Sequence, residues 1–152
     1  MNIMGFFCED LRTEVGGTES IVGILPDNMQ VPSVPGLISK VAVYFRAQIF
    51  PQDTTKSIIA SLKTPWGEVV PLGEVKEDLI SKTKAAARES NFPYGGVVMR
   101  ATISPFPIQG FGLMTAVVNV DGEERICAVM NIIPTVDATA SSPPASQSPN
   151  AS

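Results

Sequence analysis

The chain has 152 residues, of which 44% are hydrophobic and 17% are charged, and its formal net charge is −4. This length suits a single domain with a sizeable core, and the apolar content excludes a wholly disordered chain. The sequence contains no histidine, and its two cysteines, Cys8 and Cys127, form no close pair. We therefore expect no catalytic residues, no metal site and no cofactor, because Ser-His, Cys-His and zinc chemistry depend on those side chains.

The charge pattern and the cysteines also narrow the range of partners. The 11 basic residues are scattered and do not alternate with aromatic residues, so we expect no nucleic-acid binding. No segment reaches the length of a membrane-spanning helix, and the apolar start Met1–Cys8 has no basic flank, so we expect neither membrane insertion nor a signal peptide. Two thiols indicate a reduced cytosolic protein, and a Cys8–Cys127 disulfide stays open.

The first half of the chain reads as β-strands separated by turns. Two apolar runs flank Gly16-Gly17, which predicts a hairpin with strands at 3–8 and 20–25. Three prolines predict a loop or a frayed sheet edge at 26–36, because proline cannot donate a hydrogen bond to a sheet. An apolar alternation with period two predicts further strands at 41–49, 57–63 and, after a turn at Thr64–Gly67, 68–72.

One helix and a closing hairpin are predicted in the second half. Apolar residues recur at helical spacing over 77–90, with acidic residues first and basic residues later, which predicts an α-helix. A strand at 97–104 and a loop at 105–110 follow. Asp121-Gly122 then fits a type I′ turn, so the runs on either side within 111–133 form a hairpin in which Val118 faces Arg125.

Both faces of this closing hairpin are mostly apolar, whereas a sandwich strand needs only one apolar face. On the predicted register one face carries Leu113, Thr115, Val117, Ile126, Ala128 and Met130, and the other carries Met114, Ala116, Val118, Cys127 and Val129. The second face must lie under the helix or against another subunit. The interface candidates are therefore Met114, Val118, Cys127 and Val129, joined by Trp66 and Tyr94, because a loop aromatic either caps a core or anchors a partner.

Taken together, these elements predict a mainly β protein. We expect an antiparallel, immunoglobulin-like β-sandwich of seven to eight strands with one inserted helix, in a domain that spans residues 1–134. Residues 135–152 are rich in Ser, Pro and Ala and carry a single charge, Asp137. Such a composition cannot bury enough surface to offset its ordering entropy, so it predicts a flexible tail.

The N-terminal segment Phe6–Gly17, with the pattern FFCED-R-E-GG, resembles a family of small uncharacterised bacterial and bacteriophage proteins. Ser20–Ile24 continues the likeness, and Ile103–Phe106 and Val118–Glu123 resemble the closing hairpin of that family. The resemblance implies a β-sandwich with an inserted helix, in the cytoplasm of a bacterial host cell or in a virion. It implies no activity and no catalytic residues.

Three functions follow as hypotheses. The first is a non-enzymatic, self-associating protein-interaction module, such as a bacteriophage accessory or virion component, because the low charged fraction favours burial against another chain. The alternative is a small-ligand protein that binds a nucleotide-like signal through Arg12, Arg46, Arg100 and Arg125. The third is a carboxylate-based hydrolase, which needs two buried acidic side chains in one cleft.

Overall fold

A computed structural model gives the fold and describes residues 1–136. The eight longer strands follow the predicted ones: β1 (Asn2–Thr13), β2 (Glu19–Ile24), β5 (Val41–Ile49), β6 (Ile58–Lys63), β7 (Val69–Val75), β8 (Gly95–Ile103), β10 (Gly112–Val120) and β11 (Glu123–Pro134). Helix α1 (Glu77–Glu89) lies between β7 and β8. The tail predicted over 135–152 lies, from residue 137 onward, outside the described residues.

Three short strands complete the fold: β3 (Asn28–Val31), β4 (Gly36–Ile38) and β9 (Phe106–Ile108). β3 lies within 26–36 and is an edge strand, which agrees with the frayed-edge alternative, whereas the loop prediction for 105–110 is wrong over β9. β4 and β9 pair only with each other, and Pro107 of β9 lies opposite Leu37. A two-stranded sheet leaves one side of each strand free, and a proline there removes no ladder hydrogen bond.

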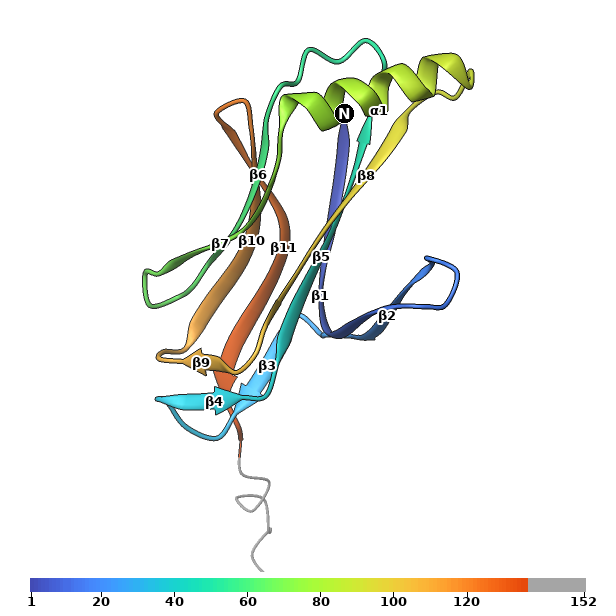
Figure 1. The fold of residues 1–152 in the computed structure, drawn as a ribbon. Coiled ribbons are helices and arrows are strands. Elements are labelled where there is room, and N and C mark those ends of the chain that lie inside the picture. Colours follow the sequence, from blue (N-terminus) through green and yellow to red (C-terminus); the bar gives the residue numbers. More distant parts are fainter. Residues whose placement is uncertain (137–152) are drawn as a thin grey trace, which may run out of the picture.

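The longer strands form two sheets that face each other as a β-sandwich (Figure 1). One sheet has four strands in the order β2-β1-β5-β8, and the other has five in the order β3-β11-β10-β6-β7. All the pairs in these two sheets are antiparallel except β3 with β11, which is parallel. The mainly β sandwich with one helix is therefore confirmed.

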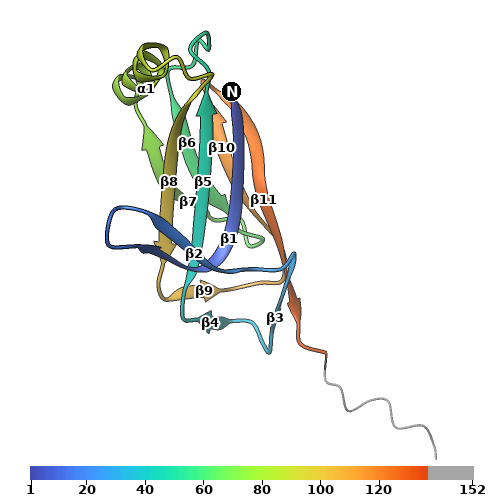
Figure 2. The ribbon, with the colours of Figure 1, turned by 90° about the vertical axis from the view of Figure 1, so that its right-hand side faces the viewer.

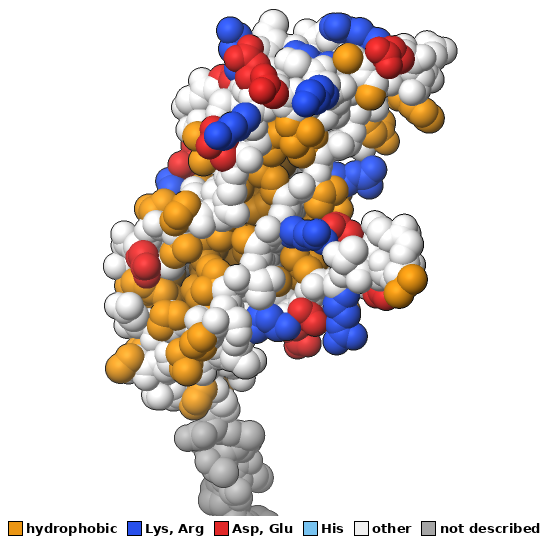
Figure 3. Space-filling model, viewed as in Figure 1, with side chains coloured by type: hydrophobic (Ala, Val, Ile, Leu, Met, Phe, Trp, Pro, Cys, Tyr) orange, Lys and Arg blue, Asp and Glu red, His pale blue; other side chains and the backbone are white. Residues whose placement is uncertain are grey.

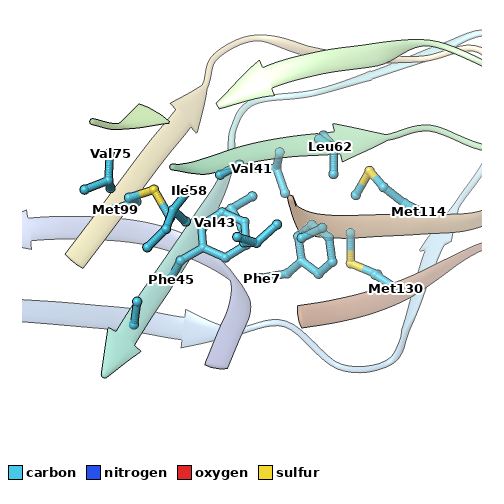
Figure 4. Packing of buried hydrophobic residues seen from close by; sticks show 14 of the residues in the cluster. Phe7, Val41, Val43, Phe45, Ile58, Leu62, Val75, Met99, Met114 and Met130 are labelled. Atoms are coloured by element: carbon cyan, nitrogen blue, oxygen red, sulfur yellow. The ribbon is translucent and has the colours of Figure 1, made fainter. Parts of the chain in front are cut away.

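The core lies between the two sheets, and both contribute buried side chains to it (Figure 4). Phe45 and Val43 come from β5, and Leu62 and Met114 come from the opposite sheet. The predicted alternation places them there, because every second residue of a strand points to the same side. In β5 the inward residues are buried and Arg46 on the other face is exposed, as predicted.

Helix α1 closes one end of the sandwich and does not lie on the outside of either sheet (Figure 1). Ile80 is fully buried in the core, and Lys84 Nζ donates a hydrogen bond to the carbonyl of Asp53 at 2.7 Å. Glu77 and Asp78 occupy its first turn, where the helix dipole favours negative charge. No helix within residues 1–136 is long and apolar enough to cross a membrane.

The second half of β1 and β2 form a hairpin, residues 9–24, which we call the arm. The arm crosses in front of β5 and β8, over the outer face of the four-stranded sheet (Figure 2). Arg100 of β8 donates hydrogen bonds to Thr13 and Glu19, and Lys40 Nζ donates to Asp10 at 2.6 Å. Cys8 and Ala42 point outward at the base of the arm and are nevertheless fully buried. The arm therefore covers one end of this outer face.

Candidate functional site

The outer face of the five-stranded sheet carries apolar side chains that are open to water. Inward residues of β10 are buried, so Leu113, Thr115 and Val117 point outward. The register of β10 with β6 and β11 brings further apolar residues to the same side. Five of them are between 43% and 65% exposed, and we call them the aliphatic face: Ile59, Val69, Leu113, Ile126 and Val129.

Val117 lies at the centre of the aliphatic face and is only 2% exposed. It pairs with Ser61 of β6 and Ile126 of β11. Lys63 lies on β6 and Glu124 on β11, on either side of β10, and the line between them passes over Val117. The Nζ atom of Lys63 and the Oε1 atom of Glu124 are 2.7 Å apart. The ion pair therefore spans β10 above Val117. It shields one apolar residue and leaves the five around it exposed.

The closing hairpin has the predicted turn but not the predicted faces. Asp121 and Gly122 have φ values of 52° and 96°, and Val118 pairs with Arg125, as predicted. The register then shifts between Ala116 and Val117, which leaves Cys127 as an extra residue in β11. A bulge of this kind moves every later side chain to the opposite face. Met130 is therefore buried in the core, and Val129 is on the aliphatic face.

Only Val129 of the six interface candidates is on the aliphatic face. Met114 and Val118 are 0% exposed, because they point into the core of their own chain, and this corrects their choice as interface residues. Cys127 is partly buried, and a Cβ on Gly5 of β1 would lie 3.1 Å from its Cβ. Sequence reasoning did not name the other four residues of the aliphatic face as interface candidates, because it assigned Leu113 and Ile126 to the opposite face of the hairpin and overlooked Ile59 and Val69. Two adjacent apolar residues, Ile58 and Ile59, were a signal of a strand with two apolar faces.

Of the two loop aromatics, Trp66 packs against the core, and Tyr94 packs against Phe50. The ring of Trp66 lies 6.0 Å from that of Phe106, and its Nε1 donates a hydrogen bond to Glu68 Oε2 at 3.1 Å. Tyr94 meets Phe50 edge to face at 6.2 Å. Both are partly exposed. Their role as partner anchors stays a prediction.

The four candidate arginines do not converge on one site. Arg12 pairs with Asp10 in the arm, and Arg125 pairs with Glu123 at the tip of the closing hairpin. Arg46 and Arg100 lie diagonally across β5 and β8 on the outer face of the four-stranded sheet. Arg125 lies in the other sheet, so the four do not line one site.

A cavity of about 480 Å³ lies beside the base of the arm. Leu25, Met29 and Ile38 form its apolar part, and Asp10, Arg12 and Lys40 form its charged part. The hydrogen bond from Lys40, and then that from Arg12, lowers the pKa of Asp10 to about 2. The positive charges here are thus already engaged by a carboxylate of the chain.

A second cavity of about 350 Å³, next to the tip of the closing hairpin, contains Asp53, Asp121 and Glu123. Asp53 accepts hydrogen bonds from the backbone N–H of Phe50 and from the Met1 amino group. Asp121 accepts bonds from the backbone N–H groups of Lys56 and Ser57. No Asp or Glu among residues 1–136 is buried, so the described residues do not provide the pair of buried acids that a carboxylate-based hydrolase needs.

The cysteines do not pair in the structure. Cys8 and Cys127 are both free thiols, and burial raises the pKa of each. The Cys8 Sγ donates a weak hydrogen bond to the carbonyl of Ala42 at 3.7 Å. In the described part of the chain, no group of three or more Cys, Asp or Glu side chains could hold a metal ion.

Comparison with protein-family models, with curated proteins and with solved structures found no match to this chain. The resemblance of the Phe6–Gly17 motif to small bacterial and bacteriophage proteins therefore stays a prediction.

Proposed function

We propose that the chain is a non-enzymatic protein-interaction module that associates with a second copy of itself through the aliphatic face. The single observation that carries this proposal is the exposure of five aliphatic side chains on four adjacent strands. The largest exposed apolar patch of a protein is often functional, and one that is rimmed by polar residues is typical of an interaction surface.

No part of residues 1–136 is placed to cover the aliphatic face. The helix closes the end of the sandwich, and the arm lies on the opposite sheet. Charged side chains gather over α1 and the arm, whereas hydrophobic ones run along the side of the five-stranded sheet (Figure 3). A cover for the aliphatic face must therefore come from elsewhere.

The charges on the aliphatic face favour a second copy as the cover. Lys63 and Glu124 lie on either side of Val117 at matching register steps. Consider a two-fold axis that lies in the plane of the contact, passes through Val117 and is perpendicular to the line from Lys63 to Glu124. Rotation about this axis places Lys63 of each copy opposite Glu124 of the other. Such a face is self-complementary, which is what an isologous dimer requires.

The size of the face predicts a weak association. Four strands about 4.8 Å apart, over about 20 Å of their length, present roughly 400 Å² of flat sheet. A standard interface buries about 800 Å² per partner. We therefore expect a dimer that dissociates in the micromolar range.

The test compares two exposed aliphatic residues, one on the aliphatic face and one on the helix at the end of the sandwich. Ile126 is 65% exposed on the aliphatic face, and Leu79 is 49% exposed on α1. Light scattering during gel filtration should show a dimer for the wild type and for Leu79→Asp at micromolar concentration, and a monomer for Ile126→Asp. A dimer that survives Ile126→Asp, or a monomeric wild type, would refute the proposal.

The cavity beside the arm gives the small-ligand function its one supporting observation. Its volume of about 480 Å³ lies within the range of ligand sites, and Arg12 is part of its wall. A thermal-shift screen against nucleotides tests this second candidate. A ligand bound there should raise the unfolding midpoint of the wild type and not that of Arg12→Ala. The setting in a bacteriophage accessory or virion component stays a prediction.

A further inference from the structure

Outside the arm, the outer face of the four-stranded sheet has no acidic residue at its ladder positions. The ladders of β1, β5 and β8 place twelve side-chain positions on this face: Asn2, Met4, Phe6, Cys8, Ala42, Tyr44, Arg46, Gln48, Gly96, Val98, Arg100 and Thr102. None of the twelve is Asp or Glu, and two are arginine. We call this surface the arginine face. Glu19 of the arm pairs with one of these arginines, Arg100, so Arg46 carries the unbalanced positive charge of this surface.

The two arginines differ in what they bind. Arg100 is engaged by Glu19 and Thr13 of the arm. Arg12, Arg88 and Arg125 are also engaged, the first and third with acidic side chains and the second with the carbonyl of Pro51. Within residues 1–136, Arg46 is the one arginine that makes neither a hydrogen bond nor an ion pair, and it is exposed.

The surroundings of Arg46 are apolar and firmly placed. Met4 pairs with it from β1 and Val98 from β8, and these two side chains are 46% and 42% exposed. One step along the strands, the rings of Phe6 and Tyr44 stack with their centroids 6.5 Å apart. Because β5 lies between two neighbours in the sheet, its backbone cannot move away from a partner. Arginine beside exposed methionine and aromatic side chains is the typical composition of a protein-interface hot spot.

We propose that the arginine face is a second docking site, which takes a segment of another protein that carries an aspartate or glutamate next to apolar side chains. The guanidinium of Arg46 matches a carboxylate in shape, with two parallel N–H donors for its two oxygens. One free guanidinium balances one carboxylate, whereas a phosphate carries up to two charges and would need a further donor. The apolar neighbours of the carboxylate would cover Met4 and Val98.

This site is independent of self-association, because the arginine face and the aliphatic face lie on opposite sides of the sandwich. A dimer formed through the aliphatic face leaves Arg46 of both copies open. The module would then present two acceptor surfaces for its partner, which raises the apparent affinity for any partner with two copies of the segment.

The test uses a displayed library of random linear peptides selected on the full chain. The recovered peptides should be enriched in Asp or Glu beside apolar residues. They should bind Arg46→Glu at least about tenfold more weakly than the wild type, because the charge-assisted pair becomes a repulsion. Lys82→Glu is the matched control, because Lys82 is exposed on α1 and its reversal changes the net charge equally. It should leave binding unchanged.

Three results would overturn the inference: no peptide recovered, recovered peptides without acidic residues, or equal binding to Arg46→Glu and to the wild type. If the thermal unfolding midpoint of Arg46→Glu equals that of the wild type, the variant is correctly folded. Arg46→Gln, which keeps the side-chain length but removes the charge, should bind with an intermediate affinity. A loss of binding in Lys82→Glu equal to that in Arg46→Glu would show that net charge alone is responsible, and it would also overturn the inference.

Discussion

The two outer faces of the sandwich have the same strand geometry, but they differ in which side chains they expose to water. On the five-stranded sheet, Ile126 and Val129 are open and one ion pair shields Val117. On the four-stranded sheet, the arm buries Cys8 and Ala42, and Arg46 stands alone beyond it. The comparison shows that the chain covers part of one face with its own arm and leaves the aliphatic side chains of the other face exposed.

The difference originates in the residues that alternate along the central strands. Outward positions of β5 carry Tyr44, Arg46 and Gln48, which can remain in water. The outward positions of β10 and β11 include Leu113, Val117, Ile126 and Val129, whose side chains have no polar group. In the proposed dimer a second copy of the chain would cover this face. The predictions below test this contrast, from the largest expected effect to the smallest.

A charge placed under the arm should destabilise the fold more than any other change discussed here. Ala42 is fully buried under the arm, and Gln48 lies on the same face of β5 beyond it. Ala42→Glu should lower the free energy of unfolding by about 3 kcal/mol or more, because a carboxylate loses its hydration without gaining a partner. Gln48→Glu should change it by less than about 0.5 kcal/mol. Urea unfolding measures both, and equal effects would show that the arm does not exclude water.

In the proposed dimer, Lys63 and Glu124 of each copy should pair with Glu124 and Lys63 of the other copy and no longer with each other. Lys63→Glu and Glu124→Lys each place like charges on both sides of the two-fold contact, and each should weaken self-association about tenfold. An equal mixture of the two variants should associate again, because every contact in the mixed dimer joins opposite charges. Sedimentation of the single variants and of the mixture tests this pairing. A mixture that stays monomeric while the wild type dimerises would disprove the two-fold register and leave self-association intact.

The hydrogen bonds from Arg100 of β8 to the arm should affect the local dynamics of the arm more than the free energy of unfolding of the whole chain. Arg100→Ala removes the hydrogen bonds to Thr13 and Glu19. Because the side chain of Arg100 is 48% exposed, its loss should lower the free energy of unfolding by less than about 1 kcal/mol. Hydrogen exchange of the amides in the arm should nevertheless accelerate, since the arm has fewer contacts to hold it. Unchanged exchange in the arm would contradict this.

The smallest expected effect concerns the stability of the fold at low pH. The pKa of Asp10 is lowered from 3.8 to about 2, because Lys40 and Arg12 donate hydrogen bonds to its ionised form. A lowered pKa in the folded chain stabilises the fold above the unfolded pKa, and this contribution disappears as the pH falls from about 4 to about 2. Asp10→Asn should therefore be less sensitive to pH in this window. Unfolding midpoints in urea across the window, for the wild type and for Asp10→Asn, test the prediction; parallel curves would refute it.

The sequence was sufficient for those elements that depend on local pattern. The strand predicted from the alternation over 41–49 has the same bounds as β5, Val41–Ile49. Asp121 and Gly122 adopt the positive φ values of the predicted turn. Helix α1 begins at the predicted Glu77 and ends one residue before Ser90. In each case a short run of residues contains the whole physical reason for the structure.

The sequence was insufficient wherever distant segments decide the outcome. The bulge at Cys127 lies where β11 packs against Gly5 of β1, a contact between distant segments, and alternation alone does not place the faces of the closing hairpin after that point. β3 forms because a parallel neighbour, β11, is available in space. The covered end of the arginine face depends on bonds from Arg100 and Lys40 to the arm, and each bond joins residues far apart in the chain.

The central claim is that the aliphatic face meets a second copy of the chain, and sedimentation equilibrium of the unmodified full-length chain tests it most directly. Over a concentration series through the micromolar range, the account predicts a mass that rises from one chain to two and no further. A mass of one chain at every concentration would contradict it, as would continued growth beyond two chains.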